Sequence, residues 1–178
     1  MKVKTLKGVF PVIFITVIVL ISVTLLAFTD SITKDRIEYQ KEQQIQGMLK
    51  EMFPDMSRYT FENDIYIIYA DGAKIGYGFL AVGKGYGGDI DILVGLEDET
   101  TIKGITIVSQ SETPGLGTRI AEASFADKFA GLNIGDVALR QAGGQVDAIT
   151  GSTISSRAVI DAVRTTAMEK VKSLKERE

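Results

Sequence analysis

The hydrophobic pattern of the chain is dominated by one continuous apolar run at residues 8–28, which contains no charged residue. As an α-helix this run is about 31 Å long, which matches the hydrocarbon thickness of a bilayer. A cleaved signal peptide would have a shorter apolar run and a small-x-small cleavage site. The Leu-Leu-Ala sequence at 25–27 makes a poor site of that kind. We therefore predict a permanent transmembrane helix over residues 8–28.

The charged segment that follows has apolar residues at roughly helical spacing. These residues are Ile32, Ile37, Ile45, Met48, Leu49 and Met52. The pattern predicts a membrane-proximal helix over residues 31–53, ending before Pro54 because the residue before a proline avoids helical geometry. Gly47 argues against a single unbroken helix, since glycine is a poor helix former.

Between residues 64 and 108 the helical spacing of apolar residues gives way to a pattern that predicts short strands. β-Branched and aromatic residues fill four segments, at 65–69, 75–82, 90–95 and 102–108, with Asp-Gly, Gly-Gly and acidic turns between them. Such a meander predicts an antiparallel sheet. Short helices are expected around residues 119–130.

The last predicted element is an amphipathic helix at about residues 155–174. Its apolar face comprises Val159, Ala162, Val163, Ala167, Val171 and Leu174. The elements together predict an α+β fold, in which a single N-terminal transmembrane helix precedes an antiparallel sheet flanked by helices. The expected organisation is a tail at 1–7, a transmembrane helix at 8–28, a membrane-proximal helix at 29–54 and a folded domain at 55–178.

The amino-acid composition narrows the possible chemistry, because the chain has neither cysteine nor histidine. Their absence excludes disulfides, thiolate-bound iron–sulfur clusters, the usual zinc sites and haem held by histidine. It also excludes Ser-His-Asp and Cys-His catalysis. We therefore expect no metal site and no catalytic side chain, so any redox chemistry requires an organic cofactor.

The charge distribution bears on partners and orientation. The net charge is −3 and the basic residues form no stripe, which argues against nucleic-acid binding. Basic residues flank the apolar run on both sides, with Lys2, Lys4 and Lys7 before it and Lys34, Arg36 and Lys41 after it. With the amino terminus included, the positive charge is slightly greater before the run, which predicts a cytoplasmic N-terminus. The folded domain then lies outside the cytoplasm.

Three segments carry candidate chemistry, and the first is KGYGGD at residues 84–89. Its glycines would let the backbone approach a flat ligand closely, and Tyr86 could pack against that ligand. A glycine-rich hairpin turn would have the same composition.

The second segment, SETPGLGT at residues 111–118, follows a predicted strand and precedes a helix. Glu112 and Thr113 supply an acceptor and a donor for the edge of a ring, and backbone N–H groups of 115–118 could meet its oxygens. An ordinary strand-to-helix loop would also be rich in Thr, Pro and Gly.

The third segment, DAITGSTISS at residues 147–156, leads into the last helix. A phosphate held at Thr153 would lie near the positive end of that helix. The alternative is a helix cap, with Ser155 or Ser156 as the capping residue and Gly151 in a turn.

In this order the three segments resemble the FMN-binding domain shared by the G subunits of Rnf electron-transport complexes and the C subunits of sodium-pumping NADH:quinone reductases. Residues 147–153 are similar to the flavin-attachment motif D-x-x-[ST]-G-[AS]-T, and Glu-Thr-Pro-Gly-Leu-Gly at 112–117 matches a segment lining the flavin. The resemblance implies FMN attached to Thr153 by a phosphoester bond. The other implied cofactor-binding residues are Tyr86, Glu112, Thr113, Gly115, Leu116, Gly117, Thr118, Thr150, Gly151 and Ser152. Ser152 stands where the family commonly has alanine.

The resemblance also implies a role in a larger assembly. It implies an electron-transfer subunit of an ion-translocating ferredoxin:NAD oxidoreductase, with no complete activity of its own. The chain would cross the inner cell membrane once and meet other membrane and redox subunits, including a second subunit with covalent FMN. Because an isolated threonine hydroxyl is a poor nucleophile, a separate flavin transferase would attach FMN from FAD with the help of a divalent metal.

Other functions remain open on the sequence. The chain could be the C subunit of a sodium-translocating NADH:quinone reductase, although that subunit is usually longer. It could be a stand-alone extracytoplasmic module that binds flavin or acts as a sensor. A structural anchor subunit, whose glycine loops are only turns, would be colourless when purified.

Overall fold

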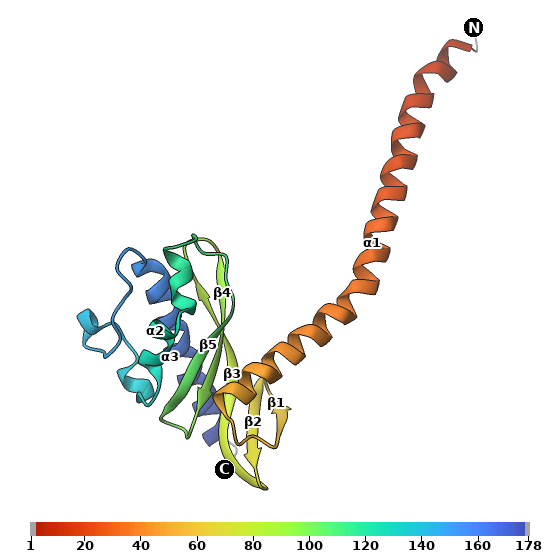
Figure 1. Ribbon diagram of the computed structural model, residues 1–178. Helices are drawn as coiled ribbons and strands as arrows, with labels where there is room; N and C mark the ends of the chain where they lie inside the picture. The colour runs from red at the N-terminus through yellow and green to blue at the C-terminus, as the bar shows by residue number, and fades with distance from the viewer. Residues whose placement is uncertain (1–2, 177–178) are drawn as a thin grey trace. The chain divides into compact units, whose positions relative to one another are not determined.

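The computed structural model describes residues 3–176 (Figure 1). Internal contacts divide the chain into two units, Met1–Gln44 and Ile45–Glu178. Helix α1 spans Val3–Met52, so the helices expected over 8–28 and 31–53 form one continuous helix that ends before Pro54. Its last turns, from Ile45 onward, belong to the second unit.

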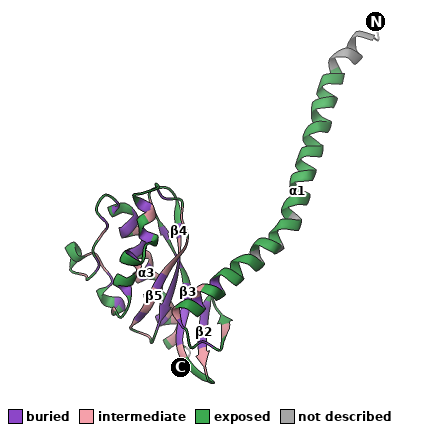
Figure 2. Ribbon diagram, viewed as in Figure 1, coloured by how far each residue is buried: buried purple, intermediate pink, exposed green. Residues whose placement is uncertain are grey.

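Residues 9–28 of the N-terminal unit are all exposed (Figure 2), and all but Thr16, Ser22 and Thr24 are apolar. Phe10 and Leu26, for example, are 70% and 71% exposed. Among the described residues, α1 is the one helix long and apolar enough to cross a membrane, with a mean hydropathy of 2.9 over its most apolar stretch. Exposed apolar surface this extensive is unfavourable in water, which together with its length indicates a membrane anchor.

The second unit contains a five-stranded sheet in which each strand pairs antiparallel with the next in sequence. The strands are β1 (Arg58–Glu62), β2 (Ile65–Ala70), β3 (Ala73–Lys84), β4 (Asp89–Leu96) and β5 (Ile102–Ser109). The predicted antiparallel meander is confirmed, and β1 is an additional strand that the sequence pattern did not predict. Asn63 and Asp64 join β1 to β2 with φ of 51° and 61°, the left-handed geometry of a tight hairpin turn.

Helices pack on both faces of the sheet, although Leu80 and Val82 of β3 remain 40% and 57% exposed. Successive strand residues point to opposite faces: Ile92 and Val94 of β4 pack in the core that includes Val159 of helix α3 (Thr153–Lys175), whereas Leu93 packs against Leu49 of α1. Short helices complete the α3 side (Figure 1). They are η1 (Gly117–Ala121), α2 (Ala123–Ala126), η2 (Asp127–Phe129), η3 (Ile134–Asp136) and η4 (Arg140–Ala142). The predicted α+β fold is therefore confirmed, with α3 and the short helices on one face of the sheet and the last turns of α1 on part of the other.

Helix α3 begins at Thr153, earlier than the expected start near Ser155. Its predicted apolar face does face the core: Val159, Val163 and Ala167 are fully buried. Ile160 is equally buried, so the buried stripe is wider than the sequence pattern indicated.

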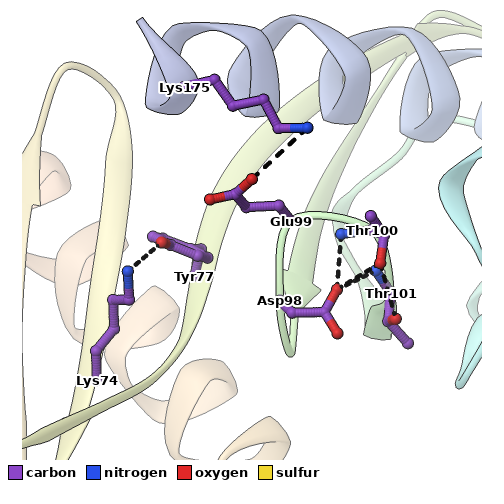
Figure 3. Close-up of polar contacts among 7 residues, drawn as sticks. All are labelled: Lys74, Tyr77, Asp98, Glu99, Thr100, Thr101 and Lys175. Carbon is purple, nitrogen blue, oxygen red and sulfur yellow. Dashed lines mark hydrogen bonds and ion pairs between the residues drawn. The ribbon is translucent and has the colours of Figure 1, made fainter. Parts of the chain in front are cut away.

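The end of α3 far from Thr153 is tied to the β4–β5 hairpin (Figure 3). Lys175 forms an ion pair of 3.7 Å with Glu99 in that hairpin. Next to it, Asp98 accepts hydrogen bonds from the backbone N–H groups of Thr100 and Thr101 at 2.7 and 2.8 Å. These bonds, that from Thr100 first, hold the pKa of Asp98 below its ordinary value. The β4–β5 hairpin is therefore held by hydrogen bonds within its own turn and by the ion pair to α3.

Gly47 provides a stability prediction because it lies exposed inside α1, with no atom within 4 Å of the position that a Cβ would occupy. Gly47→Ala should raise the free energy of unfolding of the domain by about 0.5–1 kcal/mol, since alanine loses less entropy on entering a helix. Thermal unfolding of the full chain in detergent, followed by circular dichroism, measures the change. Gly72→Ala is the control: Gly72 has equal space but a φ of +84°, so alanine there should destabilise by about 1 kcal/mol. Equal effects at the two positions would contradict this reasoning.

Candidate functional site

The three candidate segments at 84–89, 111–118 and 147–156 come together around a hollow of about 520 Å³. It lies beside the N-terminal end of α3 and is open to the surface. The lining residues are Tyr86, Glu112, Thr113, Leu116, Gly117, Gly151, Ser152, Thr153, Ile154 and Ser155. Ile154 and Ser155 were not predicted to be site residues, and their place in the first turn of α3 is what brings them here.

Glu112 links the three segments through hydrogen bonds. Its side chain is buried, with 5% exposure. Oε1 accepts a hydrogen bond of 2.9 Å from the backbone N–H of Gly87, and Oε2 accepts one of 2.5 Å from the Ser155 hydroxyl. Both carboxylate oxygens are therefore engaged within the protein, which makes Glu112 the connection between the β3–β4 hairpin and α3.

Three glycines, Gly85, Gly87 and Gly117, allow this close packing around Glu112, and a Cβ atom on Gly85 would overlap Glu112 Oε1. A Cβ atom on Gly117 would lie 2.5 Å from Glu112 Oε2 and 2.9 Å from Ser155 Oγ, and one on Gly87 would overlap the backbone carbonyl of Ser111. Real Cβ atoms do not approach other atoms so closely, so any larger residue would push the segments apart. The glycines flagged in the sequence are thus needed to bring these backbones together.

The loop at 112–118 uses most of its N–H groups internally. Gly115 N–H donates to Thr118 Oγ1 at 3.0 Å, while Leu116 and Thr118 N–H donate to the Thr113 carbonyl. The expected role of the 115–118 N–H groups toward a ligand is therefore reduced to that of Gly117. Gly115 and Thr118 do not line the hollow; they shape the turn that places Leu116.

Thr153 is the first residue of α3 and is exposed. The alternative in which Ser155 or Ser156 caps the helix is wrong, because α3 begins before both. Ser155 bonds Glu112, and the Ser156 hydroxyl accepts a hydrogen bond of 3.0 Å from Ile149 N–H. Gly151 does lie in a turn, with a φ of +84°. The turn and the Ser156 contact present Thr153 at the edge of the hollow.

Ser152 occupies the capping position of α3 but makes no capping hydrogen bond. It is only 5% exposed, and its Oγ has no hydrogen-bond partner among residues 3–176. A buried hydroxyl without a partner costs about 1–3 kcal/mol. Ser152 also lines the hollow.

A second hollow, of about 320 Å³, adjoins the first at Gly151 and Thr153 and also contains Thr150. Within it, Asp147 is paired with Arg140, a residue that was not predicted to belong to the site. The hydrogen bond and charge of Arg140 hold the pKa of Asp147 below its ordinary value. No sequence signal marked Arg140, because it lies in the irregular segment before residues 147–153 and the pairing with Asp147 arises only from the fold.

Comparisons with known proteins agree with this geometry. The FMN-binding domain family matches residues 85–167, which include the second and third segments whole and the first from Gly85 onward. The G subunit of the ion-translocating oxidoreductase complex of Methanosarcina acetivorans is 33% identical over 168 residues, covering 85% of this chain and 88% of that protein. The chain belongs to the family of G subunits of ion-translocating oxidoreductase complexes. Another G subunit, from Aliivibrio fischeri, is 32% identical over 166 residues, and the match covers 79% of this chain and 79% of that protein.

Solved structures extend the similarity of this G-subunit chain to a second type of complex. The C subunit of the Na⁺-translocating NADH-quinone reductase from Parabacteroides distasonis superposes with a TM-score of 0.51 and is 27% identical. The match covers 60% of this G-subunit chain and 61% of the other chain. NqrC of Shewanella oneidensis, at 19% identity and a TM-score of 0.51, shows a shared fold alone; the match covers 68% of this chain and 74% of that chain.

Proposed function

We propose that this chain is a membrane-anchored electron-transfer subunit of an ion-translocating oxidoreductase, and that it carries one FMN joined by a phosphoester bond to Thr153. The observation that carries the proposal is the position of Thr153. It is an exposed hydroxyl at the start of a helix, on the edge of a hollow built by the segments of the FMN-binding domain. Membership in the G-subunit family supports the oxidoreductase assignment.

The hollow fits the ring system of FMN. Its volume lies within the range of about 300–1,000 Å³ typical of cofactor sites. Its exposed rim is apolar: Tyr86, Leu116 and Ile154 are 75%, 49% and 59% exposed, and such side chains pack well against a flat aromatic ring. The unpartnered Ser152 hydroxyl supports the same fit, because the polar edge of a flavin offers it a hydrogen-bond partner.

The surroundings of Thr153 fit a phosphodiester. The first N–H groups of a helix have no partner in a preceding turn and favour an anion. A further hollow of about 330 Å³ on this side is lined by Thr153 together with Lys84 and Arg157. Asp161 also lines it, so one net positive charge remains to offset the single charge of the phosphodiester.

The protein's part in electron transfer is placement and tuning. FMN supplies the one- and two-electron chemistry. Thr153 fixes the phosphate end, the rim residues hold the ring, and Glu112 keeps the walls of the hollow together. Covalent attachment suits a carrier outside the cytoplasm, where a dissociated cofactor would be lost. Electrons must reach and leave the ring through partner subunits.

The proposal extends to how the flavin is attached and to how the chain is placed in the membrane. Thr153 has no histidine to activate it, so a separate flavin transferase acts on it, using FAD and a divalent metal. Residues 1–7 lie in the cytoplasm, 8–28 cross the membrane, 29–54 form the membrane-proximal segment and 55–178 form the extracytoplasmic flavin domain. The partners are the other membrane and redox subunits, including a second subunit with covalent FMN.

A denaturing gel tests the proposal. The chain, co-expressed with a flavin transferase, should show flavin fluorescence that survives denaturation, and Thr153→Ala should abolish it because the attacking oxygen is gone. Ser152→Ala is the matched control and should keep the fluorescence, because alanine is the residue that the family commonly has at that position. Signal that persists in Thr153→Ala would move the attachment site to a neighbouring hydroxyl. Absence of signal in the wild-type chain beside an active transferase would overturn the covalent-flavin proposal.

A further inference from the structure

Arg140 and Asp147 form a bidentate ion pair that lines the same hollow as Thr153. Arg140 Nε donates to Asp147 Oδ1 at 2.8 Å and Nη2 donates to Oδ2 at 3.0 Å. The same Nη2 donates to the Gln145 carbonyl at 3.2 Å. Parallel donation to both carboxylate oxygens fixes the direction as well as the position of the Asp147 side chain.

The backbone around the pair is fixed by contacts of its own. Arg140 N–H donates to the Val146 carbonyl at 2.9 Å, which places the start of η4 beside the residue before Asp147. Lys128 Nζ donates to the Asp147 carbonyl at 3.3 Å. The fold therefore sets where Asp147 sits, while Arg140 sets where its carboxylate points.

The pair contributes little to folding stability, because the side chains of Arg140 and Asp147 are 63% and 55% exposed and exposed pairs are weak. Its location indicates a different role. Both residues line the hollow of about 320 Å³ that also contains Thr150, Gly151 and Thr153. The pair thus forms one wall of the space through which the Thr153 hydroxyl can be approached.

We infer that Arg140 is a positioning residue for flavin attachment: it holds the Asp147 carboxylate, and with it the loop before Thr153, in the form that the flavin transferase engages. The inference rests on the proposed function. It extends the attachment site beyond the motif at 147–153 to a residue supplied by η4.

The chemistry of attachment indicates a second, electrostatic role for Arg140. The Thr153 oxygen attacks the FMN-side phosphorus of FAD, an O–P bond forms, the diphosphate P–O bond breaks, and AMP leaves while the hydroxyl proton passes to the medium. FAD brings two negative charges to this step. An unpaired Asp147 carboxylate in the same hollow would repel them, and pairing with the Arg140 guanidinium offsets that repulsion.

The test compares attachment rates in purified full-length protein. Wild type, Arg140→Gln and the control Arg119→Gln, whose exposed arginine pairs with Glu122 outside the loop, are incubated with transferase, FAD and Mg²⁺. In-gel flavin fluorescence is followed over time. Arg140→Gln should be slowed roughly five- to tenfold, because a less organised acceptor loop spends less time in the reactive form. Arg119→Gln should match wild type, and all three should melt at the same temperature.

Hydrogen exchange of the loop amides provides the second readout. The N–H groups of Ile149 and Ser152 are hydrogen-bonded, to Ser156 Oγ and to the Ile149 carbonyl. In Arg140→Gln they should exchange faster than in wild type, with other amides unchanged. Slower attachment with unchanged exchange would mean that Arg140 acts through its charge or through a direct contact with the transferase, and not by ordering the loop, which overturns the positioning role. Unchanged attachment would also overturn the inference, whereas no attachment to wild type would instead sink the proposed function.

Discussion

Replacing Glu112 with alanine should lower the free energy of unfolding of the domain by about 3 kcal/mol. The substitution removes the acceptors of the Gly87 N–H and the Ser155 hydroxyl, and each hydrogen bond to a carboxylate contributes about 1.5–3 kcal/mol. The expected loss lies at the low end of the sum of two such bonds, because the desolvation cost of the buried carboxyl group is removed with them. Chemical denaturation of the full chain in detergent, followed by circular dichroism, measures the effect.

Glu112→Gln separates the hydrogen bonds from the charge. Glutamine has the same shape, and its amide can accept from Gly87 N–H and donate to Ser155 Oγ, so the expected cost is below about 1 kcal/mol. Glu122→Ala removes an exposed glutamate whose paired cation, Arg119, is 3.7 Å away and should change stability by less than about 0.5 kcal/mol. If Glu112→Ala unfolded like Glu122→Ala, the contacts of Glu112 would not be what joins the three segments.

The role of Glu112 marks a limit of sequence-based prediction. Its position in the Glu-Thr-Pro-Gly-Leu-Gly segment predicted a place at the flavin site, and it does line the hollow. That its carboxylate is taken up by Gly87 and Ser155 was not predictable, because those residues lie on other elements. A motif identifies residue types near a site, whereas the direction of a buried side chain depends on long-range packing.

The fold was predicted most completely where a local pattern decides the structure. The apolar run, the strands beginning at Ile65 and the buried face of α3 follow from hydrophobic periodicity. Strand β1 was missed because its side chains are largely exposed, so no buried pattern marks it. The Asn63–Asp64 pair was an available signal, since both residue types tolerate the left-handed conformation that a tight hairpin requires.

The start of α3 shows why the boundaries of elements are harder to predict. Cap preferences favour a start near Ser155 or Ser156, because serine is a common capping residue. In the structure both hydroxyls bond other parts of the domain, and Ser152 stands at the capping position with its hydroxyl unpartnered among the described residues. Departures from local preference tend to occur at functional sites, and here the departure is what places Thr153 at the first position of the helix.

Gly87→Ala should destabilise the domain by about 2–4 kcal/mol. The new Cβ would overlap the Ser111 carbonyl and lie 3.2 Å from Glu112 Cα. Backbone atoms cannot rotate away, so the hairpin must separate from residues 111–112, which adds strain and breaks the bond to Glu112 Oε1. Gly104→Ala is the matched control, because its Cβ would meet only Met52 Cγ at 3.9 Å, and we expect no loss of stability there.

Gly87→Ala also tests whether covalent attachment of the flavin depends on the packing of its ring in the hollow. If the proposed attachment to Thr153 holds, Gly87→Ala should carry as much covalent flavin as wild type, because the Gly87 N–H bonds Glu112 rather than the loop at 147–153. The ring, however, should lose one wall of its hollow, and iodide should quench its fluorescence more readily in the folded protein. If quenching stayed as in wild type while stability fell, the ring would lie elsewhere, and the adjoining hollow between Lys84 and Arg157 would become the favoured seat.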